Sequence, residues 1–417
     1  MDEAGQAGKL RHFDEQEKAL LAAIQIAETA EPDANHLTTS LESLASCYSA
    51  QYRREDAKPV IARAIVVADK IAPGSNPDLN HHLTTLARAS ENMGDPKTAE
   101  QLWRRILQMD ITSFGIKSAR VAMDEGEVAL ALEFQHDDSG AEDFYNQARA
   151  TYALLNDTRG IAATLSRLSS LAILQHQYDK ADEYVAAALE ILKKDENLNA
   201  SQIANTLLKR AQVAQDRHLP AEATEYTRQA LAIQEAHSGA DVPSVAGTKR
   251  ALAQRMAKDG DLADAESLLV GAIQDEETSP RPDARKTEIL DVEALGRIYM
   301  MAKKYSEAEI QIRRSMDLIV KEDGSQARGL AGPMADLASL REDQGRSAEA
   351  EAQYKATIAF IEKNDGILSF ALDRVLRQYA WLLHTLGRKD EAQKLIARAD
   401  EVRAAHIVSL PRSPSQD

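Results

Sequence analysis

One three-position pattern occurs ten times along this chain of 417 residues, at intervals of 40 to 43 residues. Each copy has a usually small residue, a usually bulky residue four positions later and a usually small residue three positions after that. A fixed period of this length is typical of a solenoid that stacks one repeated supersecondary unit. The copies are Glu15/Ala19/Ala22, Ala57/Ile61/Ala64, Ala99/Trp103/Ile106, Ala141/Tyr145/Ala148, Ala181/Val185/Ala188, Ala223/Thr227/Ala230, Ala265/Leu269/Ala272, Ala308/Ile312/Ser315, Ala350/Tyr354/Thr357 and Ala392/Ile396/Ala399.

A second series precedes each copy from the second onward and contains one position that is always tiny. Mostly apolar residues lie three positions and one position before it, a spacing that places them on one helix face. A tiny residue on that face allows a partner helix to approach closely. Each unit is therefore predicted to be two antiparallel helices joined by a short turn. The tiny positions are Ala45, Ala87, Ala129, Ser169, Ala211, Ala253, Gly296, Ala338 and Ala380.

These residues resemble the tetratricopeptide repeat in its long form of about 42 residues, as found in kinesin light chain. The resemblance is carried by the stretch Leu37–Ala45 with Tyr48 and Glu55-Asp56-Ala57, and again by Tyr305–Glu309. It implies an all-α fold, a right-handed α-solenoid of tandem helix-turn-helix repeats, whose first helices line a concave groove that holds another polypeptide. We expect a single superhelix of about ten units over residues 1–407, with a short first unit, and a frayed tail over residues 408–417.

The chain departs from this family at two groove positions, which commonly hold Asn side chains that can bind the backbone of an extended peptide. None of the nine pairs at these positions contains Asn, so we expect recognition to depend on charge and shape. The pairs are Glu42/Ser43, Thr84/Thr85, Gly126/Glu127, Ser166/Arg167, Leu208/Lys209, Arg250/Ala251, Glu293/Ala294, Ala335/Asp336 and Arg377/Gln378.

Composition excludes several classes of partner. The net charge of −16 argues against nucleic-acid binding, which needs a basic surface, and an aromatic content of 5% argues against base stacking. No apolar run approaches the roughly 18 residues needed to span a bilayer. The start of the chain lacks the features of a secretory signal and Cys47 is the single cysteine, so the cytoplasm is favoured, with the periplasm as the alternative if a leader has been removed.

The sequence contains no phosphate-binding loop, zinc-protease motif or nucleophile elbow. Acidic residues are abundant, and close pairs are expected among 66 of them by chance alone. We therefore expect no catalytic residue, no metal site and no cofactor.

Candidate binding residues come from the helix face that the register turns toward the groove. The midsection of this face is basic and rich in amides, which suits an acidic or extended peptide. The alternative is that its cations neutralise acids from adjacent repeats. The candidates are Arg167, Ser170, Asn205, Lys209, Gln212, Arg250, Gln254 and Arg297, and a second candidate surface contains Arg377, Trp381 and His384.

The favoured function is a non-enzymatic scaffold or adaptor that binds a protein or peptide in its groove. One alternative is a regulator whose superhelical pitch changes when a peptide or small molecule binds, and another is a repeat subunit of an enzyme complex. A charged residue at a packed position, Glu125 beside Gly126, indicates weak stacking there, through either a hinge or a degenerate repeat.

Overall fold

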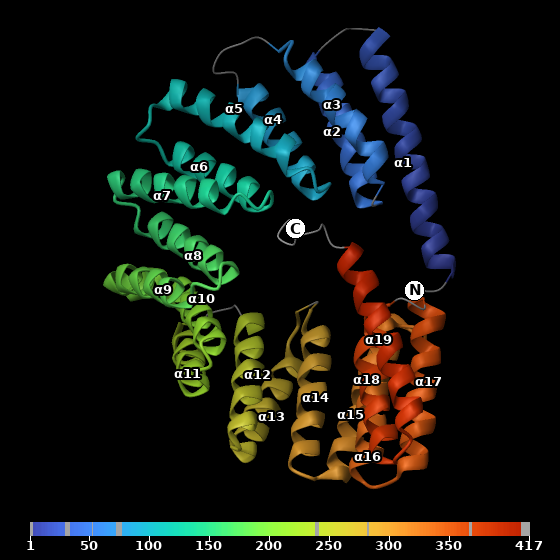
Figure 1. The fold of residues 1–417 in the computed structure, drawn as a ribbon. Coiled ribbons are helices and arrows are strands. Elements are labelled where there is room, and N and C mark those ends of the chain that lie inside the picture. The colour runs from blue at the N-terminus through green and yellow to red at the C-terminus, as the bar shows by residue number, and fades with distance from the viewer. Residues whose placement is uncertain are drawn as a thin grey trace. The chain divides into compact units, whose positions relative to one another are not determined.

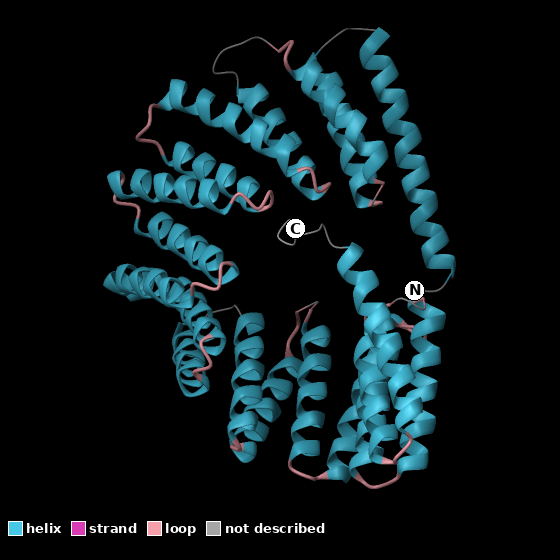
Figure 2. Ribbon diagram, viewed as in Figure 1, coloured by secondary structure: helices cyan, strands magenta, loops and turns pink. Residues whose placement is uncertain are grey.

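Every regular element that the structure describes is helical, which confirms the predicted all-α solenoid of helix pairs. This computed structural model describes residues 3–29, 34–51, 53–71, 77–237, 242–281, 283–366 and 369–409. Within those ranges lie nineteen α-helices and two 3₁₀ helices, and no strand (Figures 1 and 2). None of the described helices combines the length and the apolar character needed to cross a membrane.

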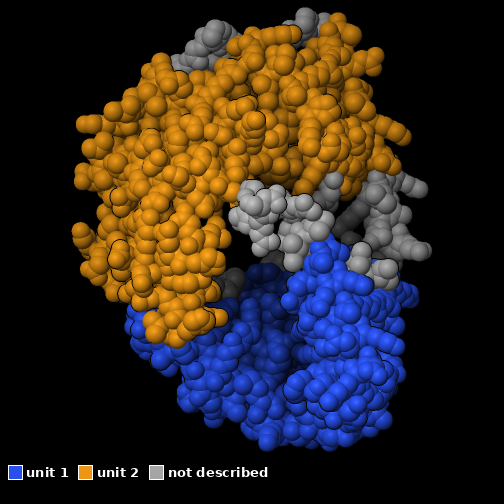
Figure 3. All heavy atoms as spheres, viewed as in Figure 1, with its two compact units in different colours: residues 1–4, 220–417 blue, residues 5–219 orange. Residues whose placement is uncertain are grey.

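The chain divides into two compact units, coloured separately in Figure 3. The N-terminal unit comprises Gly5–Leu219, and the C-terminal unit comprises Pro220–Asp417 with Met1–Ala4. The helices of the N-terminal unit are α1 (Glu3–Thr29), α2 (Ala34–Ala50), α3 (Arg54–Ala68), α4 (Pro77–Asn92), α5 (Pro96–Phe114), α6 (Ala119–Glu133), α7 (Asp138–Leu154), α8 (Thr158–Leu174), α9 (Tyr178–Leu192), η1 (Lys193–Asp195) and α10 (Glu196–Asp216).

The C-terminal unit contains the remaining helices, and its last helix reaches two residues into the predicted tail. Residues 410–417 of that tail lie outside the described residues. The helices are α11 (Pro220–His237), α12 (Val242–Asp259), α13 (Leu262–Thr278), α14 (Ala284–Met301), α15 (Tyr305–Asp323), η2 (Arg328–Leu330), α16 (Ala331–Asp343), α17 (Ser347–Asp365), α18 (Ala371–Thr385) and α19 (Lys389–Ser409).

Short turns with a common chemistry join the two helices of each repeat. A residue of the turn takes a positive φ after α4, α6, α8, α10, α12, α14, α16 and α18, which helps to satisfy the last carbonyls of the first helix. His136 does so with φ of 61°, and the Asp137 amide donates to the Leu132 carbonyl at 3.0 Å. Asp137 then begins the second helix, because its carboxylate accepts a hydrogen bond from the Gly140 amide at 3.0 Å.

The tiny residues of the second series lie where the helices approach most closely, as the register predicts. Ala45, Ala129, Ala253 and Ala338 are fully buried. First helices of successive repeats also touch one another, as α2 and α4 do in one unit and α12 and α14 in the other, whereas successive second helices do not pack comparably among the described residues. Where successive repeats touch in this way, they do so through their first helices.

One local feature differs from the sequence prediction, and a second concerns Glu125. The first repeat is not a helix pair, because the chain from Glu3 to Thr29 runs as one helix of 27 residues. Glu125, expected to weaken the stacking of its repeat, is buried and accepts a hydrogen bond from the Thr151 hydroxyl at 2.9 Å. This bond joins α6 and α7 within one repeat, so the expected weak stacking between repeats stays a prediction. The division between the compact units follows Leu219.

Candidate functional site

The eight candidate residues of the midsection do not all lie in one unit. Helices α8 and α10 of the N-terminal unit carry Arg167, Ser170, Asn205, Lys209 and Gln212. The other three lie in the C-terminal unit, with Arg250 and Gln254 on α12 and Arg297 on α14.

The two arginines of the C-terminal unit are already paired with acids from the next repeat. Arg250 Nη1 lies 2.6 Å from Asp291 Oδ1, and Arg297 Nη1 lies 3.0 Å from Asp336 Oδ2. Burial raises the pKa of Asp291 to about 6, and Arg250 opposes this shift by favouring the carboxylate. These ion pairs match the alternative that the cations neutralise neighbouring acids.

The two cations of the N-terminal unit have a different environment. The exposed side chain of Arg167 forms no ion pair or hydrogen bond with the described residues. The half-buried Lys209 ammonium donates to the Ser170 hydroxyl, which carries no charge. Burial lowers the pKa of Lys209 and the nearby Arg167 lowers it further, while the charge of the Glu133 carboxylate opposes both effects. These adjacent cations thus lack a directly paired carboxylate within the described part of the chain.

The two amide candidates of the N-terminal unit lie on α10, on the same helix as Lys209. Gln212 donates to the Asp216 carboxylate at 3.0 Å, and the Asn205 side chain is exposed. Both can form hydrogen bonds to a ligand that passes over α10, although Gln212 would exchange its bond to Asp216.

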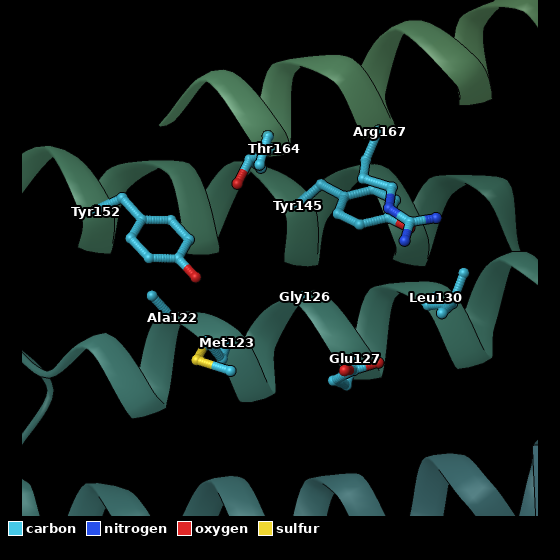
Figure 4. Close-up of a pocket in the computed structure, with 10 residues that line it drawn as sticks. Ala122, Met123, Gly126, Glu127, Leu130, Tyr145, Tyr152, Thr164 and Arg167 are labelled. Atoms are coloured by element: carbon cyan, nitrogen blue, oxygen red, sulfur yellow. The ribbon is translucent and has the colours of Figure 1, made fainter. Parts of the chain in front are cut away.

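A hollow of about 190 Å³ opens beside Arg167, between α6, α7 and α8. Arg167 lies over the Tyr145 ring, while Tyr152 directs its hydroxyl group toward Ala122 and Met123 of α6 (Figure 4). The hollow is lined by Ala122, Met123, Gly126, Glu127, Leu130, Tyr145, Tyr152, Ala163, Thr164 and Arg167.

Two tyrosines of α7 form the wall between the two inner helices. The buried Tyr145 hydroxyl donates to Glu133 Oε2 at 3.0 Å, and burial together with that carboxylate raises the pKa of Tyr145. The Tyr152 ring occupies the space that a side chain on Gly160 would fill, since a Cβ there would come within 2.3 Å of the ring. The Tyr152 ring can therefore take this position only because residue 160 is a glycine.

Sequence reasoning placed Arg167 in the candidate set but missed the hollow beside it. Tyr145 appeared there only as a core residue of the repeat pattern. The useful signal is Gly126, which occupies a groove position and has no side chain to fill the space between α6 and its neighbours. A Cβ on Gly126 would meet no other atom within 4 Å.

The second candidate surface lies on α18 of the C-terminal unit and has a neutralised cation. Arg377 Nε lies 2.9 Å from Asp373, and its Nη2 lies 2.7 Å from Asp400 of α19. Trp381 is 64% exposed and stacks on His384, with the ring centroids 6.3 Å apart. This surface presents an aromatic pair without a free positive charge.

Two buried acids are hydrogen-bonded to each other between α5 and α6. Asp124 is hydrogen-bonded to Asp110 of α5, which also accepts from Asn80 Nδ2 at 2.8 Å. Burial and the neighbouring Asp110 raise the pKa of Asp124 to about 7. No group of three His, Cys, Asp or Glu residues suited to holding a metal ion occurs in the described part of the chain.

Comparison with solved structures identifies the fold, although no protein-family model and no curated protein sequence matches the chain. The apo form of RapI aligns with 88% of this chain and 98% of its own, with a TM-score of 0.56 and 15% identity. The apo quorum sensor NprR from B. thuringiensis aligns with 89% of this chain and 100% of its own, with a TM-score of 0.53 and 14% identity.

A third match carries the name of the repeat. It is a signal-transduction ATPase from Pyrococcus horikoshii described as having a tetratricopeptide-repeat sensor, which aligns over 88% of this chain and 53% of its own, with a TM-score of 0.52 and 13% identity. The chain has the tetratricopeptide-repeat fold. This fold is consistent with binding of proteins or peptides, and at these identities the comparison establishes the fold alone.

Proposed function

We propose that this protein is a non-enzymatic binding protein that holds an acidic, extended peptide segment across α6, α8 and α10 of its N-terminal unit. The observation that carries the proposal is the pair Arg167 and Lys209, two adjacent cations without a directly paired carboxylate among the described residues. In a chain of net charge −16, whose other groove arginines are neutralised by acids, such a pair favours an external anion.

The two carboxylates nearest to the pair each have a partner of their own. Glu133 is engaged by the Tyr145 hydroxyl, and Glu127 lies 3.5 Å from Arg88. An arginine can bind a carboxylate through two parallel hydrogen bonds, which adds directional selectivity to the attraction.

A second candidate function is a regulator that responds to its ligand. The observation that favours it is the likeness to NprR, named as a quorum sensor, and to an ATPase with a repeat sensor. In this case the bound peptide would change the pitch of the repeats and so alter contacts with a second protein. Small-angle scattering with and without a bound acidic peptide separates the two functions, because a passive scaffold predicts unchanged curves.

Charge reversal at Arg167 tests the proposal. The probes are amidated 12-residue peptides with zero, two or four Asp residues in a Ser-Gly-Ala background, and the readout is fluorescence anisotropy. We expect affinity to increase with acid content and to decrease as salt rises, because exposed charges are screened over about 8–10 Å near physiological ionic strength. Arg167→Glu should weaken binding of the four-Asp peptide by roughly 10-fold or more.

The matched control is Lys97→Glu, which makes the same change in net charge on the exposed surface of α5. It should bind the four-Asp peptide as the wild type does. Equal weakening by the two substitutions, or equal binding of all three peptides by the wild type, would contradict the proposal.

A further inference from the structure

We infer that the hollow at Gly126 is a subsite for one bulky apolar side chain of the bound peptide, so that the protein selects an apolar residue next to an acidic one. The inference rests on the proposed function, because Arg167 and Lys209 supply the reason for a peptide to lie there. It adds a sequence requirement that charge alone does not provide.

The size of the hollow fits one side chain. Its volume is about 190 Å³, close to that of an apolar cavity of about 150 Å³ that binds a benzene molecule. Pockets for drug-sized ligands are larger, at about 300–1,000 Å³. A phenyl ring or a branched aliphatic group therefore matches this space.

The lining on α6 is suited to an apolar group. Met123 is 58% exposed although it is a large hydrophobic residue, and it lies with Ala122 and Leu130 along the hollow. Gly126 leaves the middle of this surface without a side chain. Methionine adapts its shape to different apolar partners, so the surface can accommodate either an aromatic or an aliphatic group.

The position of Arg167 links this subsite to the anion site. Its side chain lines the hollow, while Lys209 lies close enough for Arg167 to lower its pKa. An apolar side chain in the hollow and a carboxylate on the cations must therefore come from neighbouring residues of the peptide. The Tyr152 hydroxyl has no hydrogen-bond partner among the described residues. It lies at the other end of the hollow from Arg167 and can bind the peptide backbone beyond the apolar side chain (Figure 4).

A larger side chain at position 126 would fill the hollow and leave the anion site intact, so the contributions of the two subsites to binding can be measured separately. Gly126→Leu places an apolar side chain where a Cβ meets no other atom within 4 Å, and it leaves Arg167 and Lys209 unchanged. Gly271→Leu is the matched control, because Gly271 is also in the middle of a helix and has no atom within 4 Å of a Cβ, but it lies on α13. Gly126→Ala gives a graded intermediate that fills less of the space.

The probes are four amidated peptides with a Ser-Gly background and the central sequences Asp-Leu-Asp, Asp-Ala-Asp, Ser-Leu-Ser and Ser-Ala-Ser. We expect the wild type to bind Asp-Leu-Asp roughly 10- to 100-fold more tightly than Asp-Ala-Asp, the range for a well-filled apolar subsite. Gly126→Leu should remove this preference while retaining the affinity for Asp-Ala-Asp, and Gly271→Leu should preserve it. Circular dichroism and melting temperature verify that each variant is folded.

Three results would overturn parts of the account separately. If the wild type prefers both Asp peptides equally over the Ser peptides, the apolar subsite is wrong and the proposed function stands. If Ser-Leu-Ser binds as tightly as Asp-Leu-Asp, the anion site fails and the proposed function fails with it. Retention of the Leu preference in folded Gly126→Leu also contradicts the location of the subsite.

Discussion

Arg167 and Arg250 occupy neighbouring positions of the groove register, yet only Arg250 is neutralised within the described residues. The difference comes from the next repeat, since Asp291 of α14 reaches Arg250. The position of α10 that corresponds to Asp291 is Thr206, and Arg167 has the cation Lys209 near it instead. The sequence predicted the positions of both arginines through the repeat register. It did not predict their partners, which depend on side-chain reach between repeats.

The buried acid pair of α5 and α6 predicts a pH-dependent stability. Asp124 has a pKa of about 7 in the folded chain against an ordinary value of 3.8, so the folded state retains a proton that the unfolded chain releases. This contribution to the free energy of unfolding is complete below pH 3.8 and is lost as the pH rises through 7. The charged groups nearby are Asp110 of α5 with Glu127 and Arg120 of α6, and Asn80 of α4 donates to Asp110.

Asp124→Asn should therefore stabilise the chain at pH 8, on the order of 1–3 kcal/mol, because a neutral amide replaces a buried carboxylate and can donate to Asp110. At pH 5 the gain should largely disappear. Thermal melts at the two pH values measure the difference, with Asp143→Asn on the exposed face of α7 as the control. A wild-type pH dependence that persists in Asp124→Asn would show that this pair does not cause it.

At the scale of the helix, the small residues of the repeat pattern determine which faces can touch. Ala253 on α12 is fully buried in a cluster that includes Leu269 of α13 and Val292 of α14. These contacts follow from a spacing of three and four residues, so the sequence was sufficient to predict them. The exception is α1, where nothing in the pattern indicated that the first repeat would be one uninterrupted helix.

Overpacking at these positions tests the helix register. Ala253→Leu inserts bulk where helices nearly touch, and we expect a cost of about 1–3 kcal/mol. Glu222→Leu on the exposed surface of α11 should change the melting temperature little. Equal melting temperatures for the two variants would mean that the packed face has been assigned incorrectly.

At the scale of the molecule, the repeat pattern is continuous but the packing is not uniform. The division after Leu219 falls inside the predicted repeat that contains Ala211 and Ala223, although both residues obey the pattern and are buried. A period in the sequence reports which residues face a neighbour within each repeat. It does not report how densely successive repeats pack, so the prediction of a single superhelix over residues 1–407 stays a prediction.

The hollow beside Arg167 was also beyond the pattern, for a related reason. The hollow exists because Gly126 has no side chain and because the Tyr152 ring forms one of its walls. That ring has room only because Gly160 also has no side chain. Each glycine alone is compatible with an ordinary helix. Only the packing of α6, α7 and α8 shows that Gly126 leaves the space open and that Gly160 makes room for the Tyr152 ring beside it.

The central claim is that Arg167 and Lys209 of the N-terminal unit bind an acidic peptide. The pKa of the Lys209 ammonium group, measured with and without the peptide, tests this claim most directly. Reductive methylation with ¹³C-formaldehyde gives an NMR signal for each lysine. The signal of Lys209 is identified as the one that is missing from the spectrum of the Lys209→Arg variant. In the free protein its pKa should lie below that of an ordinary lysine, because of burial and Arg167. Saturation with the four-Asp peptide should raise that pKa, since a carboxylate favours the charged ammonium. An unchanged Lys209 pKa in the saturated complex would contradict the account.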